Sequence, residues 1–139
     1  MLTTPRAVLL WHRLEMPVDE ICSVISAIGN HDEATAQPID AISAALILAD
    51  KTDVRRSRVR NTDFLTFDIH DRVNYAVETA ELLIDKEQQE FVLSMTIDTQ
   101  ISSVLEYFEI FMERMLLCRR AAQFFHMQFK IYINHSLML

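Results

Sequence analysis

The spacing of apolar positions predicts a helical first half of the chain. Residues 5–14 and 17–28 carry apolar side chains at intervals of three and four residues, which is typical of amphipathic helices. Pro38 and Asp40 mark the start of a third helix, which we expect to end between residues 55 and 60. Its centre, AISAALILAD, is apolar on nearly every side, and this indicates burial among other helices.

The hydrophobic period changes in the second half of the chain. An irregular stretch over residues 61–68 and a short helix over 69–77 come first. Two runs rich in apolar and β-branched residues then flank the polar sequence KEQQ, and they predict a hairpin with strands at 78–85 and 90–97.

A long helix and a last strand follow the hairpin. Asp98 or Thr99 can cap a helix that we expect to continue to about Phe125. Residues 127–134 then alternate between apolar and polar side chains, as a half-buried strand does. A helix between two neighbouring strands requires those strands to be parallel. The tail therefore reads as ββαβ.

These elements predict an α+β fold in two parts. Residues 1–60 are expected to form a helical part, and residues 61–139 a connector followed by the ββαβ segment with a three-stranded sheet.

The composition of the chain argues against several classes of function. The chain of 139 residues has a single glycine and no glycine-rich phosphate loop, and its net charge of -7 argues against a nucleic-acid partner. No apolar stretch reaches the length of a membrane span, so we expect a soluble, cytoplasmic protein with no membrane partner. Cys22 and Cys118 fall within helical patterns and are expected to be buried thiols in a reducing compartment.

Two segments carry candidate metal ligands. His31 and Asp32 follow a helix stop signal, and Asp50 ends an otherwise apolar helix. Imidazole and carboxylate groups together suit a divalent metal, for which Mn, Mg, Fe, Ni and Zn are all candidates. The alternatives are a loop histidine that caps its helix or is solvated, and a helix-end aspartate that pairs with Lys51 or an arginine.

A basic segment follows Asp50. If the third helix continues, Lys51, Arg55 and Arg58 share one helical face and could bind a phosphate ester through charged hydrogen bonds. The alternative is a solvated face that pairs with Asp53 and Asp63. A second His-Asp pair, at His70 and Asp71, is expected to serve only the start of a short helix.

The stretch AIGNHDEATAQPIDAISAALILADKTDVRRSRVR resembles the second half of HD-type metal-dependent phosphohydrolases. The resemblance covers about residues 5–60. It implies that Asp50, in Ala49-Asp50, is the last metal ligand, and that His31 corresponds to an extra histidine of dinuclear members. It also implies an earlier histidine and His-Asp pair, which the sequence before His31 does not show. The catalytic residues therefore stay unknown, and we expect the chain alone to be weakly active or inactive.

The apolar surface of the long helix suggests an alternative function. Its apolar side chains spread around more than one side, and one sheet contact cannot bury them all. We therefore expect a homo-oligomer, most simply a dimer, with the long helix or the sheet edge in the interface. The alternative to a phosphohydrolase is a non-catalytic assembly or regulatory module.

Overall fold

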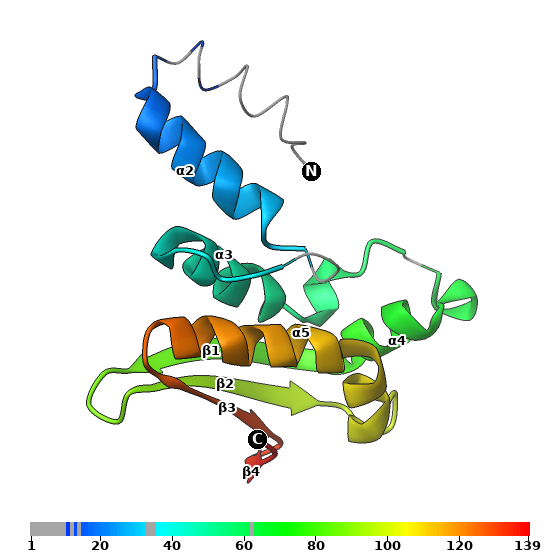
Figure 1. Cartoon of the computed structure of the whole chain (residues 1–139). Helices are drawn as coiled ribbons and strands as arrows, with labels where there is room; N and C mark the ends of the chain where they lie inside the picture. The colour runs from blue at the N-terminus through cyan, green and yellow to red at the C-terminus, as the bar shows by residue number, and fades with distance from the viewer. Residues whose placement is uncertain (1–10, 12, 14, 33–35, 62) are drawn as a thin grey trace.

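The computed structural model describes residues 11, 13, 15–32, 36–61 and 63–139 and has a mixed α and β architecture (Figure 1). Helices α2 (Val18–Gly29) and α3 (Ala41–Lys51) come first, and a sheet covered by one long helix follows. The helix expected over residues 5–14 lies largely outside the described residues. The expected α+β class is confirmed, but the prediction of three strands is wrong, because the sheet has four.

Helix α3 is shorter than the sequence predicts. It begins with a capping box, in which the Asp40 carboxylate accepts from the backbone N–H of Ser43 at 2.6 Å. It ends at Lys51, because both the hydroxyl and the N–H of Thr52 bond to the Leu48 carbonyl, at 2.6 and 3.3 Å. Val54 then turns into the core and is fully buried. The chain beyond Lys51 therefore leaves the helix several residues before the predicted end.

A connector of short helices joins the two halves. It contains η1 (Arg56–Arg58), η2 (Phe64–Thr66) and α4 (Ile69–Ala76). The side chain of Asp68 caps α4 by accepting from the N–H of Asp71 at 2.7 Å. This geometry confirms the structural role expected for the second His-Asp pair.

The sheet has the order β1-β2-β3-β4. Strands β1 (Val77–Asp85) and β2 (Glu90–Ile97) form the predicted antiparallel hairpin. Strand β3 (Gln128–Ile133) pairs parallel to β2, as expected for two strands joined by a helix. The unpredicted strand β4 (Ser136–Leu137) folds back antiparallel onto β3.

Helix α5 (Val104–Phe124) starts later than expected. The side chain and carbonyl of Asp98 are used in a turn instead, accepting from the N–H groups of Gln100 and Ile101 at 2.9 and 3.1 Å. Ser103 is the actual cap, and it forms a capping box with Glu106. Asp98, Thr99 and Ser103 can all cap a helix, and the apolar pattern does not distinguish between them, so the predicted start was too early.

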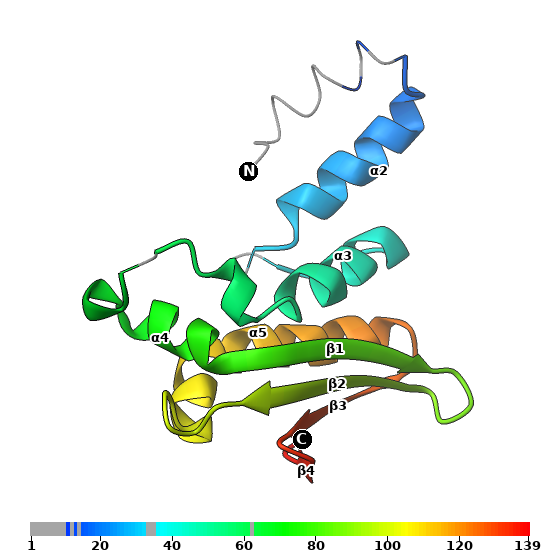
Figure 2. The ribbon, with the colours of Figure 1, turned by 180° about the vertical axis from the view of Figure 1, so that it is seen from behind.

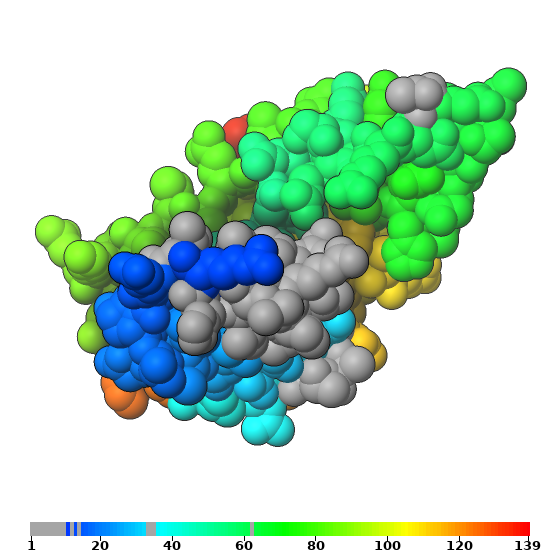
Figure 3. Space-filling model, turned by 90° about the horizontal axis from the view of Figure 1, so that it is seen from above, coloured from blue at the N-terminus to red at the C-terminus, as the bar shows by residue number. Residues whose placement is uncertain are grey.

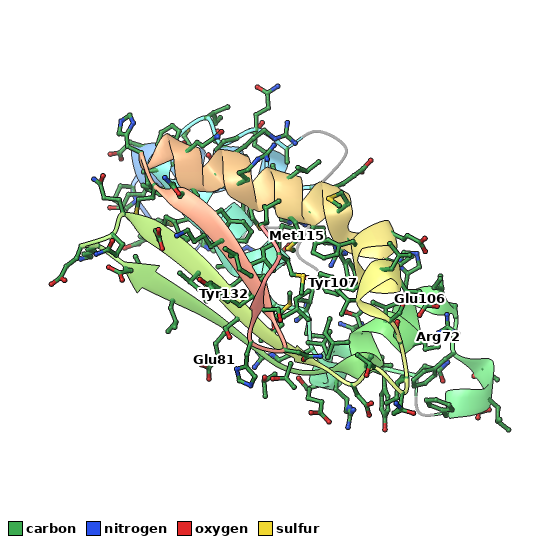
Figure 4. The ribbon with its side chains drawn as sticks, turned by 90° about the horizontal axis from the view of Figure 1, so that it is seen from below. Arg72, Glu81, Glu106, Tyr107, Met115 and Tyr132 are labelled. Carbon is green, nitrogen blue, oxygen red and sulfur yellow. The ribbon has the colours of Figure 1, made fainter. Side chains whose placement is uncertain are left out.

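The main core lies between the sheet and α5. Alternate residues of β2 and β3 point toward the helix and are buried, among them Leu93 and Ile131. Figure 4 shows Tyr107 and Met115 of α5 in this layer, where the Tyr107 hydroxyl lies 3.6 Å from the Met115 sulfur. Seen from behind, the sheet lies in front of α5 (Figure 2).

Helix α3 packs against another side of α5. Its buried residues Ala44, Ile47 and Leu48 belong to the same continuous core as α5 and the sheet. Helix α3 thus covers part of the apolar surface that the sequence assigned to an interface. What stays exposed on α5 is scattered, with Leu105 at 68% and Met112 at 41% of full exposure.

The capping box of α5 should make stability depend on acid pH. The carboxylate of Glu106 accepts from the Ser103 N–H at 2.8 Å, and also from Ser102 and Arg72 (Figure 4). The Ser103 N–H is the main cause of the lowered pKa of Glu106, and Ser102 and Arg72 lower it further. A carboxyl group with a lowered folded pKa stabilises the fold above its unfolded pKa, and this contribution disappears as the pH falls through the folded value.

We therefore expect Glu106→Gln to lower the melting temperature at pH 7 and to leave it nearly unchanged at pH 3. Thermal unfolding between pH 3 and 7 measures both curves. Glu109→Gln, one turn along the same helix, is the control and should follow the wild type. A difference in melting temperature between Glu106→Gln and the wild type that stays constant over this pH range would contradict the role of the Glu106 charge.

Candidate metal-ligating site

His31 is held at the C-terminal end of α2. Its Nδ1 atom lies 2.6 Å from the carbonyl oxygen of Ile28. A carbonyl can only accept, so Nδ1 carries the proton, and in the neutral ring Nε2 carries the lone pair. This bond caps the helix, which was the alternative expected for His31. It also gives the ring the tautomer and the fixed orientation that a metal-binding histidine needs.

Asp50 lies at the other candidate position, in the last turn of α3. Its Oδ2 atom forms an ion pair with Lys51 at 2.8 Å, which was the alternative expected for this carboxylate. The Asp50 side chain keeps 38% of its exposure, whereas that of Lys51 keeps 7%. The charges of Asp50 and Lys51 both act on the pKa of Cys118, so this end of α3 faces the C-terminal half of α5.

The two candidate ligands belong to helices that pack against each other. His31 follows the C-terminal end of α2, and Asp50 lies in the last turn of α3. Within the described ranges, no group of three or more His, Cys, Asp or Glu side chains converges as a metal-ligand set. His31 and Asp50 therefore offer one nitrogen and one carboxylate. Asp32 is exposed beside His31.

The predicted phosphate-binding residues do not share a helical face. Because α3 ends at Lys51, Arg55 and Arg58 lie in the turn and short helix that follow. Asp53 holds both of them, through Arg55 Nε at 2.7 Å and an Arg58 guanidinium nitrogen at 3.4 Å. The arginines are more than half exposed, whereas the side chain of Lys51 is buried. The structure thus brings the two arginines together and places Lys51 apart from them.

Arg56 has a contact role that the sequence gave no sign of. Its Nε donates to the carbonyl of Tyr75 at 2.8 Å, and its guanidinium lies 4.5 Å from the centre of the Tyr75 ring. It also reaches Glu78 at the start of β1, at 3.8 Å. Arg56 therefore fastens η1 to α4 and to the sheet. One arginine among four in the segment RRSRVR has no pattern that would distinguish it from the others.

The two cysteines differ in environment. Cys118 is fully buried as expected, and burial is the main cause that raises the pKa of its thiol, to about 12. Cys22 is exposed on α2, so the expectation that both thiols are buried is wrong. Its apolar neighbour Val18 is exposed as well, because only part of α2 contacts α3.

Comparisons with known proteins give no family assignment. No protein-family model, curated protein or solved structure matches the chain significantly. Among the described helices, none is long and apolar enough to cross a membrane.

Proposed function

We propose that this chain forms part of an HD-type metal-dependent phosphohydrolase domain, in which His31 and Asp50 bind a divalent metal. The supporting observation is the bond from His31 Nδ1 to the Ile28 carbonyl, which leaves Nε2 as the metal-binding atom. Such a metal polarises a phosphoryl oxygen and lowers the pKa of bound water. Two ligands do not close a site, so further ligands have to come from outside the described residues.

The protein groups around the two ligands have distinct roles in this proposal. Asp50 uses Oδ2 for Lys51, and Oδ1 is then the oxygen that binds the metal. Arg55 and Arg58 stay candidates for binding the phosphate ester, and each would exchange its contact with Asp53 for one with the substrate. This exchange is feasible because both guanidinium groups are largely exposed.

Metal binding can be tested with Mn²⁺ alone. We expect Mn²⁺ to broaden the NMR signals of the His31 ring before those of other histidines, because a ligand lies about 2 Å from the ion. His31→Gln and Asp50→Asn should each weaken Mn²⁺ binding about tenfold or more, measured by calorimetry. His70→Gln is the matched control, since His70 is exposed on α4 and far along the chain from both ligands. Uniform broadening of all histidines would refute the site.

A hydrolysis assay tests the completeness of the site separately. With Mn²⁺, Mg²⁺ or Ni²⁺ added, the chain alone should hydrolyse bis(p-nitrophenyl) phosphate no faster than its Asp50→Asn variant. Turnover that Asp50→Asn abolishes would show that this chain carries a full ligand set.

A second candidate function is a non-catalytic assembly module. The observation that favours it is an open strand edge on β1, where exposed apolar side chains accompany free backbone groups.

A further inference from the structure

Among the described residues, strand β1 pairs with one strand only. It pairs with β2 along its length apart from a bulge at Glu78, and within the described part of the chain no backbone hydrogen bond reaches its other edge from Thr79 to Asp85. The connector contacts only the start of the strand, where Arg56 meets Glu78. In the view from above, the hairpin of β1 and β2 reaches past the helices (Figure 3). The free edge is thus accessible from outside the molecule.

The side chains of this edge favour pairing. Ala80, Leu82 and Ile84 lie opposite the buried residues of β2 and so belong to the face that α5 covers. None of them is charged, although a charge on the covered face is a common protection of edge strands. Ile84 is 57% exposed and Leu83, on the opposite face, is 55% exposed. An added strand would cover both apolar side chains and satisfy the free backbone groups.

We propose that the free edge of β1 pairs antiparallel with β1 of a second copy of this chain, with Leu82 of both copies on the two-fold axis. The two sheets would then form one continuous sheet of eight strands. This inference is independent of the metal site.

Parity and charge exclude the two registers next to the one proposed. Directly opposed residues in a sheet point to the same face. When a two-fold axis perpendicular to the sheet relates two identical antiparallel strands, one residue must therefore lie opposite its own copy, with the axis between them. If that residue were Glu81, two carboxylates would face each other. If it were Leu83, Glu81 would face Asp85 of the other copy, twice. Like charges directly opposite each other destabilise a pair of strands.

The register centred on Leu82 avoids every like-charge pair. It sets Leu82 against Leu82, Ala80 against Ile84, Glu81 against Leu83, and Thr79 against Asp85. At each end of the ladder, Glu78 of one copy comes opposite Lys86 of the other. Both side chains are exposed, and among the described residues Glu78 has a single weak ion-pair contact, 3.8 Å from Arg56. The ends of the strand are therefore complementary in charge to a second copy of themselves.

Cross-linking tests the register directly. In a Cys22→Ser background, Leu82→Cys should form a disulfide-linked dimer under mild oxidation, because self-paired residues have Cβ atoms about 5 Å apart. Glu81→Cys and Leu83→Cys are the matched controls on the two neighbouring positions. Neither pairs with its own copy, so neither should cross-link. Preferential cross-linking at 81 or 83 would overturn the register.

Light scattering after size exclusion tests the assembly itself. At tens of micromolar we expect twice the chain mass of 16.2 kDa. Lys86→Glu should weaken the dimer about tenfold, because two attractive pairs become repulsive. Adding Glu78→Lys to that variant should restore it. A monomeric wild-type mass, or a dimer indifferent to these charges, would overturn the proposal, and circular dichroism checks that each variant folds.

Discussion

Leu93→Ala is expected to lower the free energy of unfolding by about 2–5 kcal/mol, the usual cost of removing a buried leucine side chain from a packed core. Leu93 is fully buried in β2, between Leu82 on β1 and Ile131 on β3, with α5 above it. Neighbours on both sides are held by the sheet and cannot move in to fill the space. The loss should therefore lie in the upper part of that range. Urea unfolding of the two proteins measures the difference.

Leu83→Ala is the matched control for this substitution. The same side chain is removed from the same hairpin, but Leu83 points to the uncovered face of the sheet and is 55% exposed. A change within about 0.5 kcal/mol is expected, as for most surface positions. The measurement belongs at low protein concentration, where a dimer would not contribute. Equal losses for the two variants would show that α5 does not cover the face that carries Leu93.

The second large effect is expected in thiol reactivity. Cys22 should react with Ellman's reagent at an ordinary rate, whereas Cys118 should stay unreacted in the folded protein. Burial raises the pKa of Cys118 to about 12, from a usual value of 9.0, so its thiolate fraction is lowered about a thousandfold, in addition to its lack of access. Absorbance should therefore report one thiol per chain under native conditions.

Denaturant and a single substitution separate the two thiols. In the Cys22→Ser variant, native protein should release almost no colour, and both wild-type thiols should react once the chain is unfolded. The slow reaction of Cys118 would then report the opening of the α3–α5 contact. Rapid labelling of Cys118 in the folded Cys22→Ser variant would contradict its burial.

The sequence predicted the elements better than their ends. The hairpin was predictable from two strand-like runs around the polar sequence KEQQ, and the parallel strand from the alternation in 127–134 after a helix. The end of α3 was not predicted, because it depends on the Thr52 side chain bonding back to the Leu48 carbonyl and on Val54 entering a core formed with residues far along the chain. Strand β4 was missed because it has only two residues and shows no period.

The turn before β4 explains why the sequence did not predict that strand. Asn134 and His135 both have positive φ, 49° and 67°, as a two-residue hairpin turn requires. Asn134 also bonds through its side chain to both backbone groups of Ile97, at 2.8 and 2.9 Å. That contact joins the ends of β2 and β3, and the local sequence gives no pattern that would predict it.

The candidate site was predictable only as residue types. His31 and Asp50 stood out because each follows an apolar helix, and this could be read from the chain. Their capping and ion-pair partners, Ile28 and Lys51, are close in sequence and were anticipated as alternatives. The prediction that Lys51, Arg55 and Arg58 share one helical face was wrong, because it required α3 to continue beyond Lys51, and the helix ends there with Thr52 as its cap.

The short strand β4 has a consequence for the size of any assembly. Beyond β4, the chain stays bound to β3, where Met138 donates to the Ile131 carbonyl and Ile131 donates to that of Leu139, at 2.8 and 3.1 Å. The outer edge of β3 is therefore occupied by the chain's own last residues. A sheet with one blocked edge and one open edge can add a single partner, and that partner brings its own blocked edge. In the proposed dimer both β1 edges are paired, and each outer edge is the two-residue strand β4, so little edge is left for a third copy to extend.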